Sequence, residues 1–190
     1  MKDPTIKPLT TLNDPGLIAL LSKGGVAVIP TDTVYGIVSR YDLPEAVNKV
    51  RRLKHRDKDQ AFIVLCANSD QVKQVGVSDK TLEKTKKYWP GKVSIVMTPS
   101  VKYPDISGNL EGIAFRIPNN TDLHDLLLAT GPLVAPSANP KGLDPALTIQ
   151  QAIDYFGNSV DVYVDGGEAI SQPSKLIKIH SDGHEEIIRA

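Results

Sequence analysis

Polar side chains crowd into a short segment that follows an apolar run near the amino terminus. Residues 26–29 are Val-Ala-Val-Ile, a continuous β-branched run that is typical of a strand buried on both faces. Thr31, Asp32, Thr33 and Tyr35 then supply hydroxyl and carboxylate groups before Gly36. In an open α/β sheet ligands bind where strands end, so this segment is a candidate binding site. An ordinary turn is the alternative, because such residues also favour turns.

Two basic residues, Lys54 and Arg56, are separated by one residue at the end of an expected helix. If the chain is extended there, both side chains project to the same side. Arginine offers a planar bidentate fork and lysine a mobile point charge, and this pair suits a polyphosphate. The alternative is a basic helix end that is exposed to water and stabilised by the helix dipole.

Small polar groups crowd a second strand end at residues 136–142. An expected strand over residues 133–135 runs into Pro136, Ser137, Ala138 and Asn139. No GxSxG elbow surrounds Ser137 and no histidine is an obvious partner, so the sequence does not favour a nucleophilic serine.

The elements expected to position these residues alternate between strands and helices. A helix over residues 16–23 begins at Asp14 and Pro15, and Asp42 with Glu45 predicts the capped start of the next helix. The apolar stripe of that second helix leaves Arg51 and Arg52 off the buried face, where alanine substitutions should be nearly silent. Further strands are expected at 61–66, 93–97, 112–117 and 160–164, a long surface loop at 98–111, and a hairpin formed by 174–179 and 186–189. The pattern predicts an α/β fold with a mixed sheet, in one domain over residues 1–190 with its core from about residue 13.

Composition excludes several function classes. Lys plus Arg and Asp plus Glu are both 22, so any anion site must be local. Neither the GxxxxGK[ST] loop nor GxGxxG after a strand occurs, and the four histidines lack metal-ligand spacing, so no protein-held metal is expected. The single Cys66 suits a reducing compartment, and no signal peptide or bilayer-length apolar run is apparent. We expect a soluble cytoplasmic protein without membrane contact.

The chain resembles the YrdC-like proteins, from about residue 24 to residue 174 and toward residue 189. Five motifs occur in the family's order: IPTDTVYG at 29–36, Lys-x-Arg at 54–56, Trp-Pro-Gly at 89–91, Phe-Arg-Ile-Pro at 115–118, and Pro-Ser-Ala-Asn at 136–139 with Gly142. The Lys-x-Arg followed far downstream by Ser-x-Asn is the family's signature. Asp57 departs from it, since proline is common there. Its carboxylate could weaken phosphate binding or help to hold a metal.

The resemblance implies a single YrdC-like domain in which a twisted mixed β-sheet with helices surrounds a concave ligand-binding basin. It also implies a nucleotidyltransferase that condenses L-threonine, bicarbonate and ATP, with Mg²⁺, to threonylcarbamoyl-AMP and pyrophosphate. That product serves N6-threonylcarbamoyladenosine (t6A) modification in tRNA processing, so tRNA or t6A-pathway proteins are possible partners.

The implied site residues fall into two groups. By resemblance, Lys54 and Arg56 are catalytic, and ATP is bound by Lys54, Arg56, Gln60, Ser137, Asn139 and Arg189. Threonine is bound by Thr33, Tyr35, Arg116 and Ser174.

Two other functions remain open from the sequence. One is a paralogous protein on the same fold that acts on another carbamoyl substrate. The other is a double-stranded RNA or tRNA-binding protein that uses a basic cluster, although zero net charge and few aromatic residues count against it. The cluster consists of Lys49, Arg51, Arg52, Lys54, Arg56 and Lys58.

Overall fold

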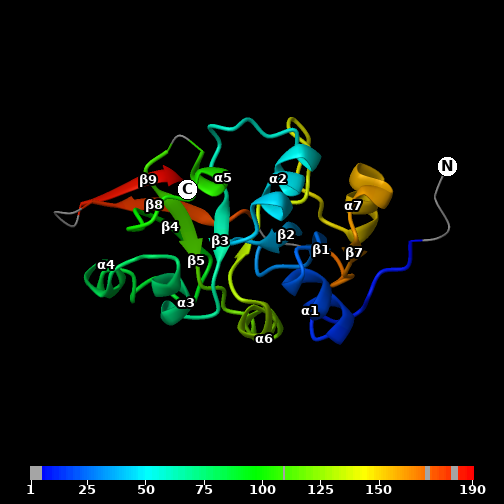
Figure 1. Cartoon of the computed structure of the whole chain (residues 1–190), viewed down its shortest axis with the longest axis horizontal. Coiled ribbons are helices and arrows are strands. Elements are labelled where there is room, and N and C mark those ends of the chain that lie inside the picture. The colour runs from blue at the N-terminus through cyan, green and yellow to red at the C-terminus, as the bar shows by residue number, and fades with distance from the viewer. Residues whose placement is uncertain (1–5, 109, 170–171, 181–183) are drawn as a thin grey trace.

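The computed structural model describes residues 6–108, 110–169, 172–180 and 184–190. In these residues a nine-stranded sheet runs through the molecule in the order β7-β1-β2-β6-β3-β5-β4-β8-β9 (Figure 1). The strands are β1 (Ala27–Ile29), β2 (Gly36–Arg40), β3 (Ile63–Leu65), β4 (Val93–Met97), β5 (Ile113–Arg116), β6 (Leu133–Val134), β7 (Val162–Tyr163), β8 (Lys175–Ile179) and β9 (Glu185–Arg189). The helices are α1 (Pro15–Ser22), α2 (Pro44–Leu53), α3 (Ser69–Gln74), α4 (Asp79–Glu83), α5 (Pro104–Ser107), α6 (Thr121–Thr130) and α7 (Ile149–Phe156), with a 3₁₀ turn at Gly157–Ser159.

The sheet is mixed, which confirms the expected fold class. β3 pairs with β5 in parallel, whereas β4 pairs with β5 antiparallel and with β8 in parallel. β8 and β9 are antiparallel, as predicted for the terminal hairpin, and the expected turn at residues 182–183 lies outside the described residues.

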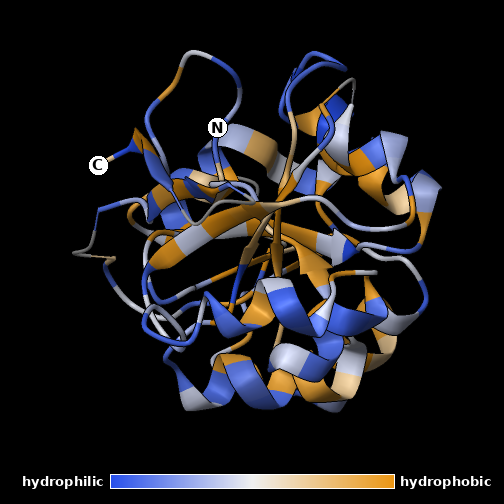
Figure 2. Ribbon diagram, turned by 90° about the vertical axis from the view of Figure 1, so that its left-hand side faces the viewer, coloured by the Kyte–Doolittle hydropathy of each residue, from blue (hydrophilic) through white to orange (hydrophobic). Residues whose placement is uncertain are grey.

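Apolar side chains form two cores, one on each face of the sheet. Leu17 and Leu21 of α1 are fully buried and join Leu123, Leu126 and Leu127 of α6 in one core. The other core includes Val47 and Val50 of α2 and Ala152 of α7, with Val28, Ile37 and Phe115 from the sheet. Figure 2 shows the same division, with apolar strands inside and polar residues on the outer sides of the helices.

Two polar loops at strand ends, the predicted ligand-binding segments, are joined through their backbones. Ile37 N donates to Pro136 O at 3.0 Å and Ala138 N donates to Tyr35 O at 2.7 Å. A Cβ on Gly36 would lie 3.2 Å from Thr31 Cγ2, so glycine allows the first loop to close tightly here. Segments that are about 100 residues apart in the sequence therefore form one edge of the site.

Two local predictions were wrong, and strand β2 (residues 36–40) was not predicted at all. Helix α5 lies within the segment 98–111 that was expected to be a loop. Asp42 does not cap α2: Leu43 holds the N-cap position without a side-chain bond, and the Asp42 carboxylate pairs with Arg40. Pro44 fixes the first helical turn, so α2 begins one residue later than a cap at Asp42 would require.

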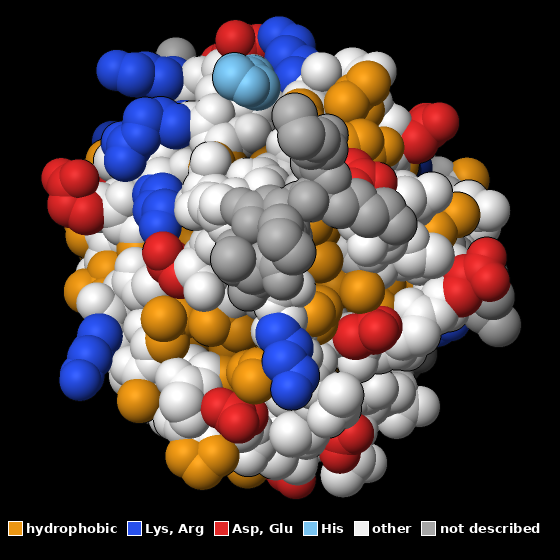
Figure 3. All heavy atoms as spheres, turned by 90° about the vertical axis from the view of Figure 1, so that its right-hand side faces the viewer, with side chains coloured by type: hydrophobic (Ala, Val, Ile, Leu, Met, Phe, Trp, Pro, Cys, Tyr) orange, Lys and Arg blue, Asp and Glu red, His pale blue; other side chains and the backbone are white. Residues whose placement is uncertain are grey.

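Charges of both signs are mixed on one face of the molecule. Figure 3 shows acidic and basic side chains interspersed among apolar and neutral ones on the face where α1 and α7 lie. Within the described part of the chain, no helix has the length and apolar character that a bilayer span requires.

Candidate active site

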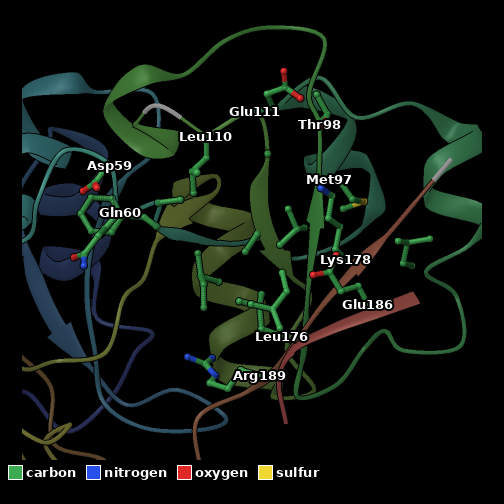
Figure 4. A pocket seen from close by; sticks show the side chains of 18 of the residues that line it. Asp59, Gln60, Met97, Thr98, Leu110, Glu111, Leu176, Lys178, Glu186 and Arg189 are labelled. Carbon is green, nitrogen blue, oxygen red and sulfur yellow. The ribbon is translucent and has the colours of Figure 1, made fainter. Parts of the chain in front are cut away.

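A cavity of about 1190 Å³ lies over the sheet between the loop after α2 and the β8–β9 hairpin (Figure 4). In Figure 4, Gln60 and Asp59 lie on one side, Lys178 and Glu186 on the other, and Arg189 at the lower end. All six residues that the resemblance assigned to ATP line this cavity: Lys54, Arg56, Gln60, Ser137, Asn139 and Arg189. The structure therefore brings this group together from the end of α2 and the loop after it, the loop after β6, and β9.

Lys54 sits at the carboxyl end of α2 and is almost fully buried. Its ammonium group donates to Ser137 O, to Asn139 O at 2.7 Å and to Asn139 Oδ1 at 3.1 Å. Burial, followed by the positive charge of Arg56, lowers the pKa of Lys54 to about 7. Lys54 thus ties the Ser-x-Asn loop to the helix end and carries a proton that is easily lost.

The chain between Lys54 and Arg56 forms a turn. It is not extended, as the phosphate interpretation had assumed. His55 has a φ of 50°, the left-handed conformation in which helices often end. Both flanking side chains nevertheless line the same cavity, as expected. A turn, and not an extended segment, brings them there.

Arg56 is a half-buried cation without a carboxylate partner among the described residues. Its Nη2 donates to Ala61 O at 2.6 Å, its guanidinium carbon lies 5.1 Å from the centre of the Phe62 ring, and its Nε has no hydrogen-bond partner in the described structure. Burial, then the charges of Arg51 and Arg189, lower the pKa of Arg56 to about 10. An anion in the cavity would supply both the missing acceptor and the missing negative charge.

The Ser-x-Asn loop is braced internally. Ser137 Oγ donates to Asn139 Oδ1 at 2.6 Å, and Asn139 Nδ2 donates to Leu143 O at 2.6 Å. Lys141 also lines the cavity and forms an ion pair with Asp57, so two loops close against each other there. Lys141 was not predicted as a site residue, although it lies two residues after Asn139. The Asp57 carboxylate points to this lysine.

Thr33 and Arg116 belong to a second cluster, beside rather than in the lining of the large cavity. Arg116 Nη2 lies 3.0 Å from Asp32 Oδ1, with both side chains 4% exposed, and 3.3 Å from Thr33 Oγ1. Arg116 Nε and both Asp32 oxygens lack an aligned hydrogen-bond partner in the described residues. Burial lowers the pKa of Arg116, the charge of Asp32 raises it, and the charge of Arg189 lowers it further. The sequence placed Asp32 in a candidate binding segment, but the resemblance gave this residue no role.

Arg189 connects the two groups of predicted site residues. Its Nε and Nη2 donate to Ser174 O at 3.0 and 2.7 Å, while Ser174 Oγ lies 2.8 Å from Ser94 Oγ. Because Arg189 also influences the pKa values of Arg56 and Arg116, three guanidinium groups share one electrostatic environment. The positive charges of these three described residues favour the binding of an anion between them.

Tyr35 has a structural role in this arrangement. Its hydroxyl donates to Gly167 O at 2.7 Å and accepts from Gly166 N at 2.9 Å, and the side chain is buried. Tyr35 therefore anchors the polar loop to residues 166–167 and does not line the large cavity.

No group of three or more His, Cys, Asp or Glu residues in the described part of the chain could hold a metal ion. The basic cluster considered for RNA binding also does not form one exposed stripe. Lys54 and Arg51 are buried, and Lys49 bonds to Asp161 at 2.7 Å.

The family model described as "Telomere recombination", Sua5/YciO/YrdC, matches residues 19–190. The chain belongs to the Sua5/YciO/YrdC family. Within this family, the chain is 34% identical to a protein of Pseudoalteromonas atlantica named threonylcarbamoyl-AMP synthase, over 89% of this chain and 93% of the relative. A protein of the same name from Marinobacter nauticus is 33% identical over 82% of this chain and 85% of the relative.

Solved structures of the family share the fold. P. abyssi Sua5 in complex with L-threonine superposes with a TM-score of 0.81 at 26% identity, over 90% of this chain and 52% of the Sua5 chain. The chain thus spans about half the length of Sua5. E. coli YciO superposes with a TM-score of 0.84 at 20% identity, over 97% of this chain and 95% of YciO, which is a likeness of fold alone.

Proposed function

We propose that this protein is a threonylcarbamoyl-AMP synthase that joins L-threonine, bicarbonate and ATP and releases pyrophosphate. The observation that carries the proposal is the convergence of Lys54, Arg56 and Arg189 on one cavity beside the Thr33–Arg116 cluster. The names of relatives that cover most of this chain support the same reaction, and the Sua5 complex supports threonine as a substrate.

ATP would place its phosphates among the cations that line the cavity. Arg56 Nε offers an unused donor, and Ser137 and Asn139 add polar groups at the same wall. Mg²⁺ would enter with ATP, coordinated mainly by phosphate oxygens and water, as this ion is commonly held. These positive charges would stabilise the negative charge that develops as pyrophosphate leaves the α-phosphate.

Threonine would bind at the cluster of Thr33, Arg116 and Ser174. A threonine carboxylate could accept from Arg116 Nε, which has no hydrogen-bond partner in the described structure, while Thr33 and Ser174 supply hydroxyl groups. Arg189 lies between this cluster and the proposed phosphate site. Tyr35 would shape this site indirectly by fixing the loop.

The reaction needs positioning more than a protein nucleophile. The threonine amine and bicarbonate form a carbamate with loss of water, and a carbamate oxygen then attacks the α-phosphate as the bond to pyrophosphate breaks. Holding three reactants in line is a large part of such a rate enhancement. Ser137 Oγ donates a hydrogen bond to Asn139 Oδ1 and forms none with a histidine in the described residues, so we assign Ser137 to phosphate binding.

Pyrophosphate release tests this function directly. We expect release from ATP only when threonine, bicarbonate and Mg²⁺ are all present. Equal release without threonine would contradict the proposal, and release that requires another acceptor would indicate a paralogous activity. The product would serve t6A modification of tRNA, and RNA affinity without pyrophosphate release would favour an RNA-binding protein.

ATP affinity should fall as the pH rises above 7. Only the protonated form of Lys54 attracts phosphate, and its pKa is about 7 in the free protein. Between pH 7.5 and 9, where ATP is already ionised, we expect a loss of about tenfold per pH unit. Calorimetry should show a flatter profile for Lys54→Arg, because arginine keeps its charge.

Unfolding measurements distinguish the pH dependence of ATP affinity from a pH dependence of protein stability. The pKa of Lys54 is lower in the folded protein than its ordinary 10.5, so the unfolded chain binds more protons between these values. The contribution of Lys54 to the free energy of unfolding therefore rises with pH across this window. Equal pH profiles of ATP affinity for the original protein and Lys54→Arg would show that Lys54 is not the titrating group.

A further inference from the structure

Arg51 is a buried arginine whose contacts are all made inside the protein. It lies in the last turn of α2 and is 7% exposed, although its sequence position predicted a solvated side chain. The prediction was wrong because the loop after α2 and helix α5 fold back over this side of the helix. An arginine buried in this way must have its donors satisfied, since an unpaired buried cation is costly.

The guanidinium of Arg51 satisfies its donors with backbone carbonyl groups of two segments. Nη1 donates to Asp57 O at 2.6 Å and to Gln60 O at 3.0 Å, and Nη2 donates to Asp105 O at 2.8 Å. The first two carbonyl groups belong to the loop that carries Arg56, and the third belongs to α5. The planar guanidinium group of Arg51 therefore links the loop to both α2 and α5.

Arg51 also contacts the ring that supports Arg56. Its guanidinium carbon lies 4.5 Å from the centre of the Phe62 ring, and that of Arg56 lies 5.1 Å from the same centre. The backbone N–H of Arg56 donates to Arg51 O at 3.1 Å. The position of Arg56 thus depends on Arg51 through the backbone, through the loop and through Phe62.

We propose that Arg51 is a positioning residue that shapes the loop of residues 54–62, so that Arg56 and Gln60 face the cavity. The proposal rests on the proposed function, in that this loop would then bind the phosphates of ATP. Arg51 does not line the cavity itself and acts through its neighbours. Its charge also adds to the positive field at Arg56, as the lowered pKa of Arg56 reflects after the effect of burial.

Amide hydrogen exchange without substrates tests the proposal independently of activity. In Arg51→Ala and Arg51→Lys we expect the amides of Arg56 and Gln60 to exchange about tenfold faster or more, because charge-assisted hydrogen bonds to the loop are lost. Lysine should not restore protection, since its ammonium group cannot reproduce the planar fork. Arg52→Ala is the matched control, because Arg52 is the next residue and is exposed.

Steady-state kinetics and MgATP calorimetry complete the test. The KM for ATP and the Kd of MgATP should rise about tenfold in Arg51→Lys, while the KM for threonine stays nearly constant. Loop exchange and MgATP affinity equal to those of Arg52→Ala would overturn the proposal. If the original protein releases no pyrophosphate, the proposed function fails, but the exchange experiment still decides the role of Arg51. If Arg51→Ala does not fold, the results for Arg51→Lys alone decide whether Arg51 positions the loop.

Discussion

Replacing Arg56 with alanine should lower the rate of pyrophosphate release by a factor on the order of 10² or more, the usual effect of removing a preorganised donor. Arg56 is half-buried in the wall of the cavity and brings a buried, unused Nε donor and a charge without a carboxylate partner in the described structure. We expect the loss mainly in kcat, because charge on the leaving pyrophosphate develops in the transition state.

Arg52→Ala provides the control for this substitution. Arg52 carries the same charge four positions earlier, but it is exposed and does not line the cavity. Its removal should leave the rate nearly unchanged and the stability within about 0.5 kcal/mol. Full activity in Arg56→Ala would show that the loop after α2 is not part of the active site. Equal losses in RNA affinity for both variants would instead support an RNA-binding surface.

Breaking the ion pair between Asp32 and Arg116 should destabilise the protein strongly. Both side chains are 4% exposed, so Arg116→Met leaves a buried carboxylate without its cation. Such changes cost about 3–5 kcal/mol, which corresponds to a drop in Tm of roughly 6–20 °C for a chain of this size. Urea unfolding monitored by circular dichroism measures the change in free energy.

Two further variants make this result interpretable. Lys49→Ala breaks an ion pair whose side chains are 33% and 36% exposed, so it should cost no more than about 1 kcal/mol. The double variant Asp32→Leu with Arg116→Met removes both charges and should recover much of the stability. A loss in Arg116→Met that is no larger than in Lys49→Ala would show that the buried pair is not important for the fold.

The parts of the site that could be predicted have strong local signals. An apolar run followed by Thr31–Gly36, or by Pro136–Asn139, indicates a buried strand that ends in polar groups. The family resemblance then assigned Lys54, Arg56 and Arg189 to one ATP site, and the structure places all three at one cavity.

The parts that could not be predicted depend on segments distant in sequence. The apolar stripe of α2 placed Arg51 in solvent, and only the folding of residues 57–60 and α5 over the helix buries it. The pairing of Asp32 with Arg116 likewise joins residues 84 positions apart, which no period in the sequence indicates. The helix cap expected at Asp42 is absent, and the Asp42 carboxylate pairs with Arg40 instead.

Incorporation of ¹³C-labelled bicarbonate tests the central claim, that one active site joins ATP, threonine and bicarbonate. The purified protein is incubated with labelled bicarbonate, threonine and MgATP, and the products are analysed by mass spectrometry. We expect one product that contains threonine, AMP and the labelled carbon, formed together with pyrophosphate and greatly reduced in Arg56→Ala. Pyrophosphate release without labelled carbon in a threonine-containing product would contradict the account.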